Sequence, residues 1–127
     1  MSGIIMLQNV MFIALGGAVG AISRYLISEI VDSSEFPLAT FIVNTLGCLL
    51  IGFLSAFYLE NLFSDTVFLT LGIGVLGAFT TMSTFSLENI NLMREGEYAA
   101  ALFYISCTFI ICIFSTWIGL SVGQKIA

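Results

Sequence analysis

Four long stretches of this 127-residue chain contain no charged residue, and they limit the fold more than any other feature of the sequence. They are residues 1–23, 36–59, 66–87 and 98–124. The hydrocarbon core of a bilayer is about 30 Å thick, and about 20 helical residues span it. Each stretch is long enough to cross this core, so the sequence predicts four transmembrane helices joined by short connections.

The expected fold is therefore an all-α membrane protein with a single integral membrane domain over residues 1–127. The predicted spans are about 6–30, 38–60, 66–93 and 98–123. A soluble helical bundle is the alternative, but helices of soluble proteins keep a polar face, which these stretches lack. The first stretch does not match a secretory signal, because it has no positive flank and further spans follow it. We expect a multi-pass protein of the cell inner (plasma) membrane.

The composition argues against several classes of function. Charged residues make up 9% of the chain, against about a quarter in a typical soluble domain. A net charge of -5 with only three basic residues provides no basic surface for nucleic acid. The chain has no histidine, the commonest general base and a common zinc ligand. The three cysteines all lie within predicted spans and are expected to be packing residues. We therefore expect neither an enzyme nor a nucleic-acid-binding protein.

The basic residues are divided almost evenly between the two sides of the predicted membrane. With four spans, both termini lie on the side that carries Lys125, whereas the other side carries Arg94 and, if it reaches the interface, Arg24. An excess of Lys and Arg normally fixes the cytoplasmic side. So weak a bias allows insertion in both orientations, and the natural assembly is then an antiparallel two-fold homodimer. A small but sufficient bias toward one orientation is the alternative.

The third span combines glycines with hydroxyl residues in an unusual order. Gly72, Gly74 and Gly77 precede a run of threonines and serines within residues 80–86. Glycine and threonine both disfavour a regular helix, so we expect a helix break near residues 77–81 that gives two half-helices. A break frees backbone groups, which a membrane tolerates only where they face protein, water or an ion. An intact but kinked helix, with hydroxyls bonded to the preceding turn, is supported equally well.

Further polar side chains are predicted at membrane depth. Asn44 lies inside the second span, and Arg24 and Glu88 lie near the ends of the first and third. Intramembrane charges usually line a pathway or pair with each other, although Arg24 can also extend to the interface. The fourth span has a polar residue at every fourth position, on one helix face: Tyr104, Thr108, Cys112 and Thr116. Hydrogen bonds between helices explain each residue alone, whereas the whole set favours a hydrated pathway.

Three motifs lie in the first three spans. They read GGAVGAISRY at residues 16–25, FIVNTLG at 41–47 and GAFTTMSTFSLE at 77–88. Their sequence, order and spacing resemble the Fluc family of fluoride channels, also called CrcB, over nearly the whole chain. The resemblance implies an antiparallel, dual-topology homodimer in the lipid membrane. It would pass fluoride ions passively, export them from the cell and give resistance to fluoride toxicity.

The resemblance also implies roles for individual residues. Backbone carbonyls of Gly77 and Thr80 would hold a structural sodium ion (Na+) at the dimer centre, which is not transported. Arg24 and Glu88 match charged positions of the family. The residues that match the fluoride pathway are Asn44, Met82, Ser83, Thr84, Phe85, Ser86, Tyr104 and Thr108.

Met82 departs from the family pattern, which has phenylalanine at this position and three residues later, at Phe85. A phenyl ring presents a positive edge to an anion. A thioether does not, although its methyl group is flexible and apolar. We expect conduction to survive this exchange with an altered rate.

Two other functions remain open at this point. A small multidrug-type proton-coupled exporter is also a four-helix, dual-topology dimer, but that class has a glutamate early in the first span, and residues 1–23 contain no acid. A non-transporting assembly subunit would explain the glycine pairs Gly16/Gly20 and Gly119/Gly123, which let membrane helices approach closely. It would not explain the polar spans.

Overall fold

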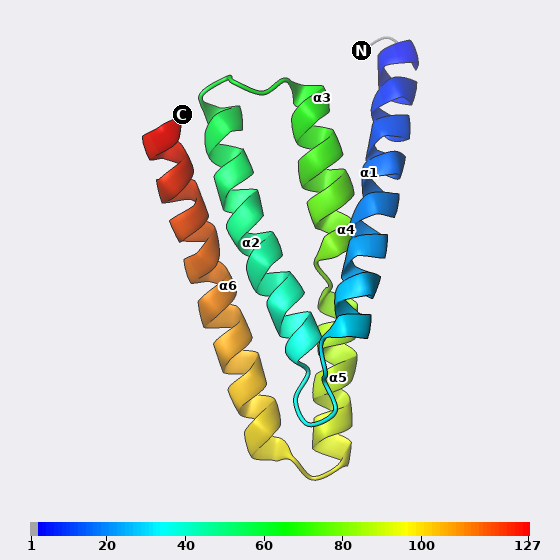
Figure 1. Cartoon of the computed structure of the whole chain (residues 1–127), viewed down its shortest axis with the longest axis vertical. Coiled ribbons are helices and arrows are strands. Elements are labelled where there is room, and N and C mark those ends of the chain that lie inside the picture. The colour runs from blue at the N-terminus through cyan, green and yellow to red at the C-terminus, as the bar shows by residue number, and fades with distance from the viewer. Residues whose placement is uncertain (1–2) are drawn as a thin grey trace.

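The computed structural model describes residues 3–127, and all regular structure in this range is helical (Figure 1). Three spans are single helices: α1 (Gly3–Ile30), α2 (Leu38–Leu59) and α6 (Tyr98–Ile126). The remaining span is built from four pieces: α3 (Asp65–Phe68), the π-helix η1 (Leu69–Leu76), α4 (Gly77–Phe79) and α5 (Met82–Arg94). The three single helices and the composite third span are each long and apolar enough to cross a membrane. The predicted all-α, four-span fold is confirmed, and the segments begin and end within a few residues of the expected bounds.

The spans alternate in direction, so that both ends of the described chain lie at the same end of the molecule (Figure 1). As a result, α2 and α6 run in the same direction side by side, and α1 lies beside the upper part of the third span. The lower part of the third span, α5, packs mainly against α6. The break thus lies between the part of the third span that packs against α1 and the part that packs against α6.

The contact between α2 and α6 is made backbone to backbone. A Cβ atom added at Gly52 would lie 2.1 Å from the Thr116 carbonyl oxygen, and one at Gly119 would lie 2.0 Å from the Leu49 carbonyl oxygen. Real Cβ atoms do not approach other atoms this closely, so only glycine fits at these positions. Small residues allow such close packing of membrane helices, and Gly119 belongs to one of the pairs expected to do so.

The same device joins α1 to the π-helix η1. A Cβ atom at Gly16 would lie 2.5 Å from the Thr70 carbonyl oxygen, and one at Gly20 would lie 2.0 Å from that of Val75. The predicted packing role of the Gly16/Gly20 pair is confirmed. Together these contacts hold the helices that surround the break.

The break itself consists of two extended residues. Thr80 has φ −77° and ψ 155°, and Thr81 has φ −148° and ψ 116°. Both lie inside the predicted interval of residues 77–81, and the kinked but intact helix is excluded. The π-helix before the break was not predicted. Its wider turns place one additional residue in each turn.

Candidate functional site

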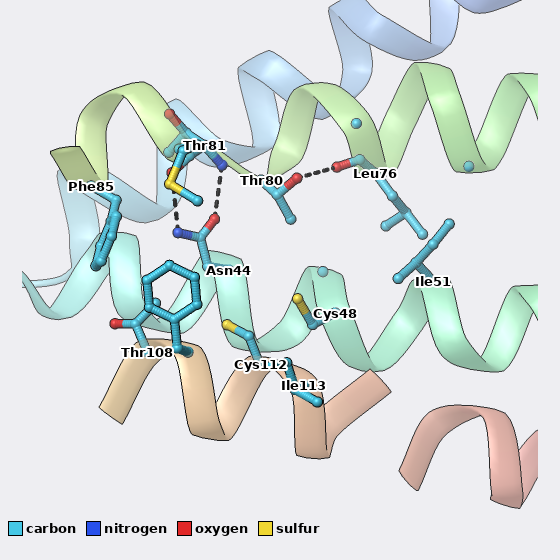
Figure 2. A pocket seen from close by; sticks show the side chains of 15 residues that line it. Asn44, Cys48, Ile51, Leu76, Thr80, Thr81, Phe85, Thr108, Cys112 and Ile113 are labelled. Atoms are coloured by element: carbon cyan, nitrogen blue, oxygen red, sulfur yellow. Dashed lines mark hydrogen bonds between the residues drawn. The ribbon is translucent and has the colours of Figure 1, made fainter. Parts of the chain in front are cut away.

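The side chain of Asn44 on α2 bonds to both backbone groups of Thr81 at the break (Figure 2). Its Nδ2 donates to the Thr81 carbonyl oxygen over 3.1 Å, and its Oδ1 accepts from the Thr81 amide over 2.8 Å. Only 7% of Asn44 is exposed. The Asn44 side chain thus replaces the partner that a continuous helix would have given the Thr81 amide, and it adds a second donor to the Thr81 carbonyl, which as N-cap accepts the first bond of α5.

The hydroxyl of Thr81 begins the second half-helix. Its Oγ1 accepts from the Thr84 amide over 3.2 Å and donates to the Thr84 hydroxyl over 3.0 Å. Threonine in extended conformation before a helix is a favoured N-cap, because it satisfies an amide that has no partner within the helix. The start of α5 at Met82 is therefore encoded by Thr81.

The break redirects the amides that would bond the carbonyls of Gly77 and Thr80. In a continuous α-helix these carbonyls accept from the amides four residues later, those of Thr81 and Thr84. The Thr81 amide instead bonds Asn44, and the Thr84 amide bonds the Thr81 hydroxyl. The two carbonyls assigned to sodium by resemblance thus lose their regular partners. The carbonyl of Ala78, in contrast, accepts from Arg24 Nε over 3.1 Å.

A cavity of about 330 Å3 lies beside the break, between α2, the third span and α6 (Figure 2). Six of the predicted site residues line it: Asn44, Gly77, Thr80, Met82, Phe85 and Thr108. Its lining contains no charged side chain. The Thr108 hydroxyl is buried and has no hydrogen-bond partner among residues 3–127. The cavity therefore has an apolar wall with a few polar groups, as small-ligand sites commonly do.

Met82 and Phe85 both line this cavity but lie in different surroundings. Met82 is 63% exposed, whereas Phe85 is 5% exposed. The Phe85 ring makes edge contacts with Tyr104, at 4.9 Å between centroids, and with Phe109, at 6.1 Å. The ring of Phe85 is therefore fixed by its neighbours, while Met82 is left free at the start of α5.

Glu88 is held by two hydroxyl donors from two other helices. Thr40 on α2 donates to its Oε1 over 2.7 Å, and Tyr104 on α6 donates to its Oε2 over 2.8 Å. The side chain of Tyr104 is fully buried. Charge-assisted bonds of this kind are stronger than bonds between neutral groups. They tie the lower parts of α2, α5 and α6 together.

Arg24 and Glu88 do not pair with each other in the described structure. Arg24 instead borders a second cavity of about 110 Å3, where Thr40, Thr81 and Thr84 provide hydroxyl groups. The predicted residues Arg24 and Thr84 therefore meet here, apart from the larger cavity.

Four predicted residues border neither cavity: Glu88, Tyr104, Ser83 and Ser86. Ser83 and Ser86 are both exposed on α5, and the Ser86 hydroxyl bonds back to the Met82 carbonyl over 2.8 Å. Within one chain, therefore, neither serine hydroxyl lines a cavity, although Ser83 Oγ lies 3.3 Å from Thr81 Oγ1. The roles of all these residues in an ion pathway stay predictions.

Two residues that the sequence analysis did not select are central to the site. Thr81 caps α5 and pairs with Asn44, and Thr40 holds Glu88. Thr40 could have been found, because it lies four residues before Asn44 and therefore on the same face of the second span. Thr81 was noted only as part of the hydroxyl run.

Comparisons with known proteins agree with the geometry. The family model described as CrcB-like protein, Camphor Resistance (CrcB), matches residues 11–120. A protein of Shewanella halifaxensis named fluoride-specific ion channel FluC is 42% identical over 116 residues, which cover 89% of this chain and 94% of the relative. A protein of the same name from Magnetococcus marinus is 39% identical over 123 residues, covering 94% of this chain and all of the relative.

Proposed function

This chain belongs to the CrcB family, and from that membership we propose that it forms a fluoride-selective channel. It is a multi-pass membrane protein, with four helices able to span the bilayer. We place it in the inner (plasma) membrane of the cell. The proposed activity is passive movement of an ion, so no bond is made or broken and no catalytic residue is required.

The observation that carries the proposal is the Thr108 hydroxyl beside the larger cavity, which has no hydrogen-bond partner in the described part of the chain. Fluoride is small and strongly hydrated, so a narrow pathway must replace its water with hydrogen-bond donors. A free hydroxyl can donate to an anion. Carboxylates would repel an anion, and no carboxylate lines this cavity.

Selectivity in this proposal follows from size and donor geometry. A larger halide needs more space than a site fitted to fluoride provides, and it gains less from the same donors. Passage also requires several moderate binding positions, because one very strong site would hold the ion. Arg24 raises the local concentration of anions near one end of the pathway.

Ion efflux from liposomes that contain the purified protein tests this function. Fluoride is expected to leave much faster than chloride under the same gradient. Thr108→Val, which keeps the shape of the side chain but removes the hydroxyl, is expected to slow fluoride efflux. Equal fluxes of fluoride and chloride would contradict the proposal.

We further propose that the working unit is an antiparallel homodimer. The near balance of Arg24, Arg94 and Lys125 across the membrane supports insertion in both orientations. A tag at the C-terminus is expected on both sides of the membrane in intact cells. Added lysines at one terminus are expected to force one orientation and abolish efflux, until a chain of opposite orientation is supplied. A tag found on one side only would contradict the antiparallel dimer.

A structural sodium ion at the dimer axis is the third part of the proposal. The carbonyls of Gly77 and Thr80 have lost their regular amide partners, and carbonyl oxygen suits a small hard cation. Bound sodium would supply positive charge to these carbonyls and hold the break in shape. The dimer is expected to dissociate more readily when sodium is replaced by a large organic cation. Equal dimer stability in both salts, or a sodium current, would refute this role.

A further inference from the structure

Two cysteine side chains enter the larger cavity from different helices. Cys48 on α2 and Cys112 on α6 both line the cavity, and their sulfur atoms point into it (Figure 2). Both are free thiols of intermediate burial. Both thiols enter this one cavity from helices whose backbones are in direct contact. The proposed function gives neither of them a role.

The position of this thiol pair follows from the helix repeat. Cys48 lies four residues after Asn44 on α2, and Cys112 lies four residues after Thr108 on α6. Each thiol is therefore one turn further along the same helix face. Because α2 and α6 run in the same direction, the two thiols form the next layer of the cavity (Figure 1).

The backbone contact between α2 and α6 fixes the distance between the thiols. Gly52 lies one turn after Cys48, and a Cβ atom there would meet a backbone oxygen of α6 at 2.1 Å. Helices in such contact cannot move apart without losing it, so the pair is preorganised. Preorganised ligands lose less freedom on binding.

The chemistry of the pair selects one class of ligand. Within residues 3–127 there is no group of three or more His, Cys, Asp or Glu side chains that could hold a metal. A four-coordinate ion such as zinc therefore lacks ligands here. Two thiolates alone suit a soft cation that accepts two ligands. A divalent cation balances their two charges, and a neutral site costs least at membrane depth.

We propose that Cys48 and Cys112 together bind a soft divalent cation, for which Hg2+ is the probe, and that the bound cation obstructs the pathway. On binding, both S–H bonds break, two protons pass to water and two metal–sulfur bonds form. No electron is transferred. The obstruction rests on the proposed function, whereas the binding does not.

Retention of Hg2+ by the purified full chain tests the binding. Cys107→Ser serves as the parent, because Cys107 does not line the cavity and the pair then provides the only thiols. A second thiol in one site raises the affinity about 10²- to 10⁴-fold over a single thiol. The parent is expected to keep the ion against an excess of a competing monothiol, and Cys48→Ala and Cys112→Ala in this background are expected to release it.

Intact mass and the ultraviolet absorption of the mercury–thiolate bond report the bound ion without any flux measurement. Size-exclusion profiles show that each variant is folded. If both single variants retain Hg2+ as firmly as the parent, or if the parent releases it, the shared site is refuted.

Fluoride efflux from liposomes tests the obstruction. Hg2+ is expected to slow efflux through the parent, and a dithiol reagent that removes the ion is expected to restore it. Each single variant, compared with its own untreated efflux, is expected to lose most of this sensitivity in the presence of the monothiol. Unchanged efflux with the ion bound refutes the obstruction. A protein that retains Hg2+ but never passes fluoride contradicts the proposed function and the obstruction with it, while the binding result stands.

Discussion

Replacing Asn44 with alanine is expected to destabilise the protein through the helix break. The change removes the only acceptor found for the Thr81 amide among residues 3–127 and one of two donors to the Thr81 carbonyl, which still accepts the first bond of α5. A buried polar group left without a partner costs about 1–3 kcal/mol, which is the expected cost of the orphaned amide. Hydrogen bonds between membrane helices average about 0.6 kcal/mol each, which gives a lower figure of about 1.2 kcal/mol for the two.

The adjoining cavity decides where in this range the effect falls. Water that enters the cavity can bond one of the freed groups in part, because a bridging water is nearly as good a partner as a direct one. We therefore expect Asn44→Ala to lower the free energy of unfolding by about 2 kcal/mol, between the two estimates for lost bonds and an unpaired amide. Asn44→Asp keeps the acceptor but buries a carboxylate whose second oxygen faces the Thr81 carbonyl, so its loss is expected to be at least as large.

Denaturant titration in detergent, followed by far-ultraviolet circular dichroism, measures this free energy. Asn89→Ala is the matched control, since it also removes a buried asparagine. Asn89 Nδ2 bonds the Phe85 carbonyl in its own helix, which keeps its backbone partner, and Asn89 Oδ1 has no partner among the described residues. Little change is expected for the control. If Asn44→Ala costs no more than Asn89→Ala, the paired bonds do not hold the break.

Three further predictions concern positions around the break. Gly119→Ala is expected to destabilise the chain strongly in the same titration, since its Cβ would lie 2.0 Å from a backbone oxygen of α2. Gly77→Ala is expected to be accommodated within one chain, because the nearest atom to its Cβ is 3.6 Å away. A large effect of Gly77→Ala on dimer association in detergent would therefore indicate that Gly77 lies at the dimer axis. Thr81→Val is expected to lower the stability by about 0.5–2 kcal/mol through loss of the N-cap, with Thr81→Ser restoring most of it; an equal loss in both would show that the hydroxyl is not the cause. Met82→Phe is expected to retain fluoride efflux, because Met82 is exposed and tolerates a ring, while Phe85→Ile is expected to reduce it, because the ring edge is lost from the cavity; parental efflux from Phe85→Ile would place the pathway elsewhere.

The membrane spans could be predicted because absence of charge reports directly on membrane crossing. A charge inside the bilayer is costly, so the four uncharged stretches at residues 1–23, 36–59, 66–87 and 98–124 locate the spans from the sequence alone. The place of the irregularity could be predicted for a similar reason, since glycine and threonine act locally on the helix that contains them, but the sequence did not decide between a break and a kink. Both features depend on neighbouring residues only.

Features that depend on distant residues could not be read in the same way. Asn44 and Thr81 are 37 positions apart, and no local pattern around either residue indicates that the two are paired. The resemblance placed Ser83 and Ser86 in one pathway with Asn44, whereas within a single chain both serines are exposed and away from the cavity. The π-helix was missed because its hydrogen-bond register leaves no regular pattern of side chains.

The π-helix η1 changes the structural effect that a single-residue deletion is expected to have in this chain. Residues 69–76 form wide turns that hold more residues than an α-helix of the same length. Removing one of them would allow the segment to tighten into an α-helix, in which each residue advances the helix by about 100°. Because the wide turn holds the extra residue, its removal would leave the residues on either side in about the same orientation, and the Thr81 amide would still face Asn44. One deletion in this segment is therefore expected to be tolerated, whereas the same deletion within α2 or α6 would rotate every residue beyond it by about 100°.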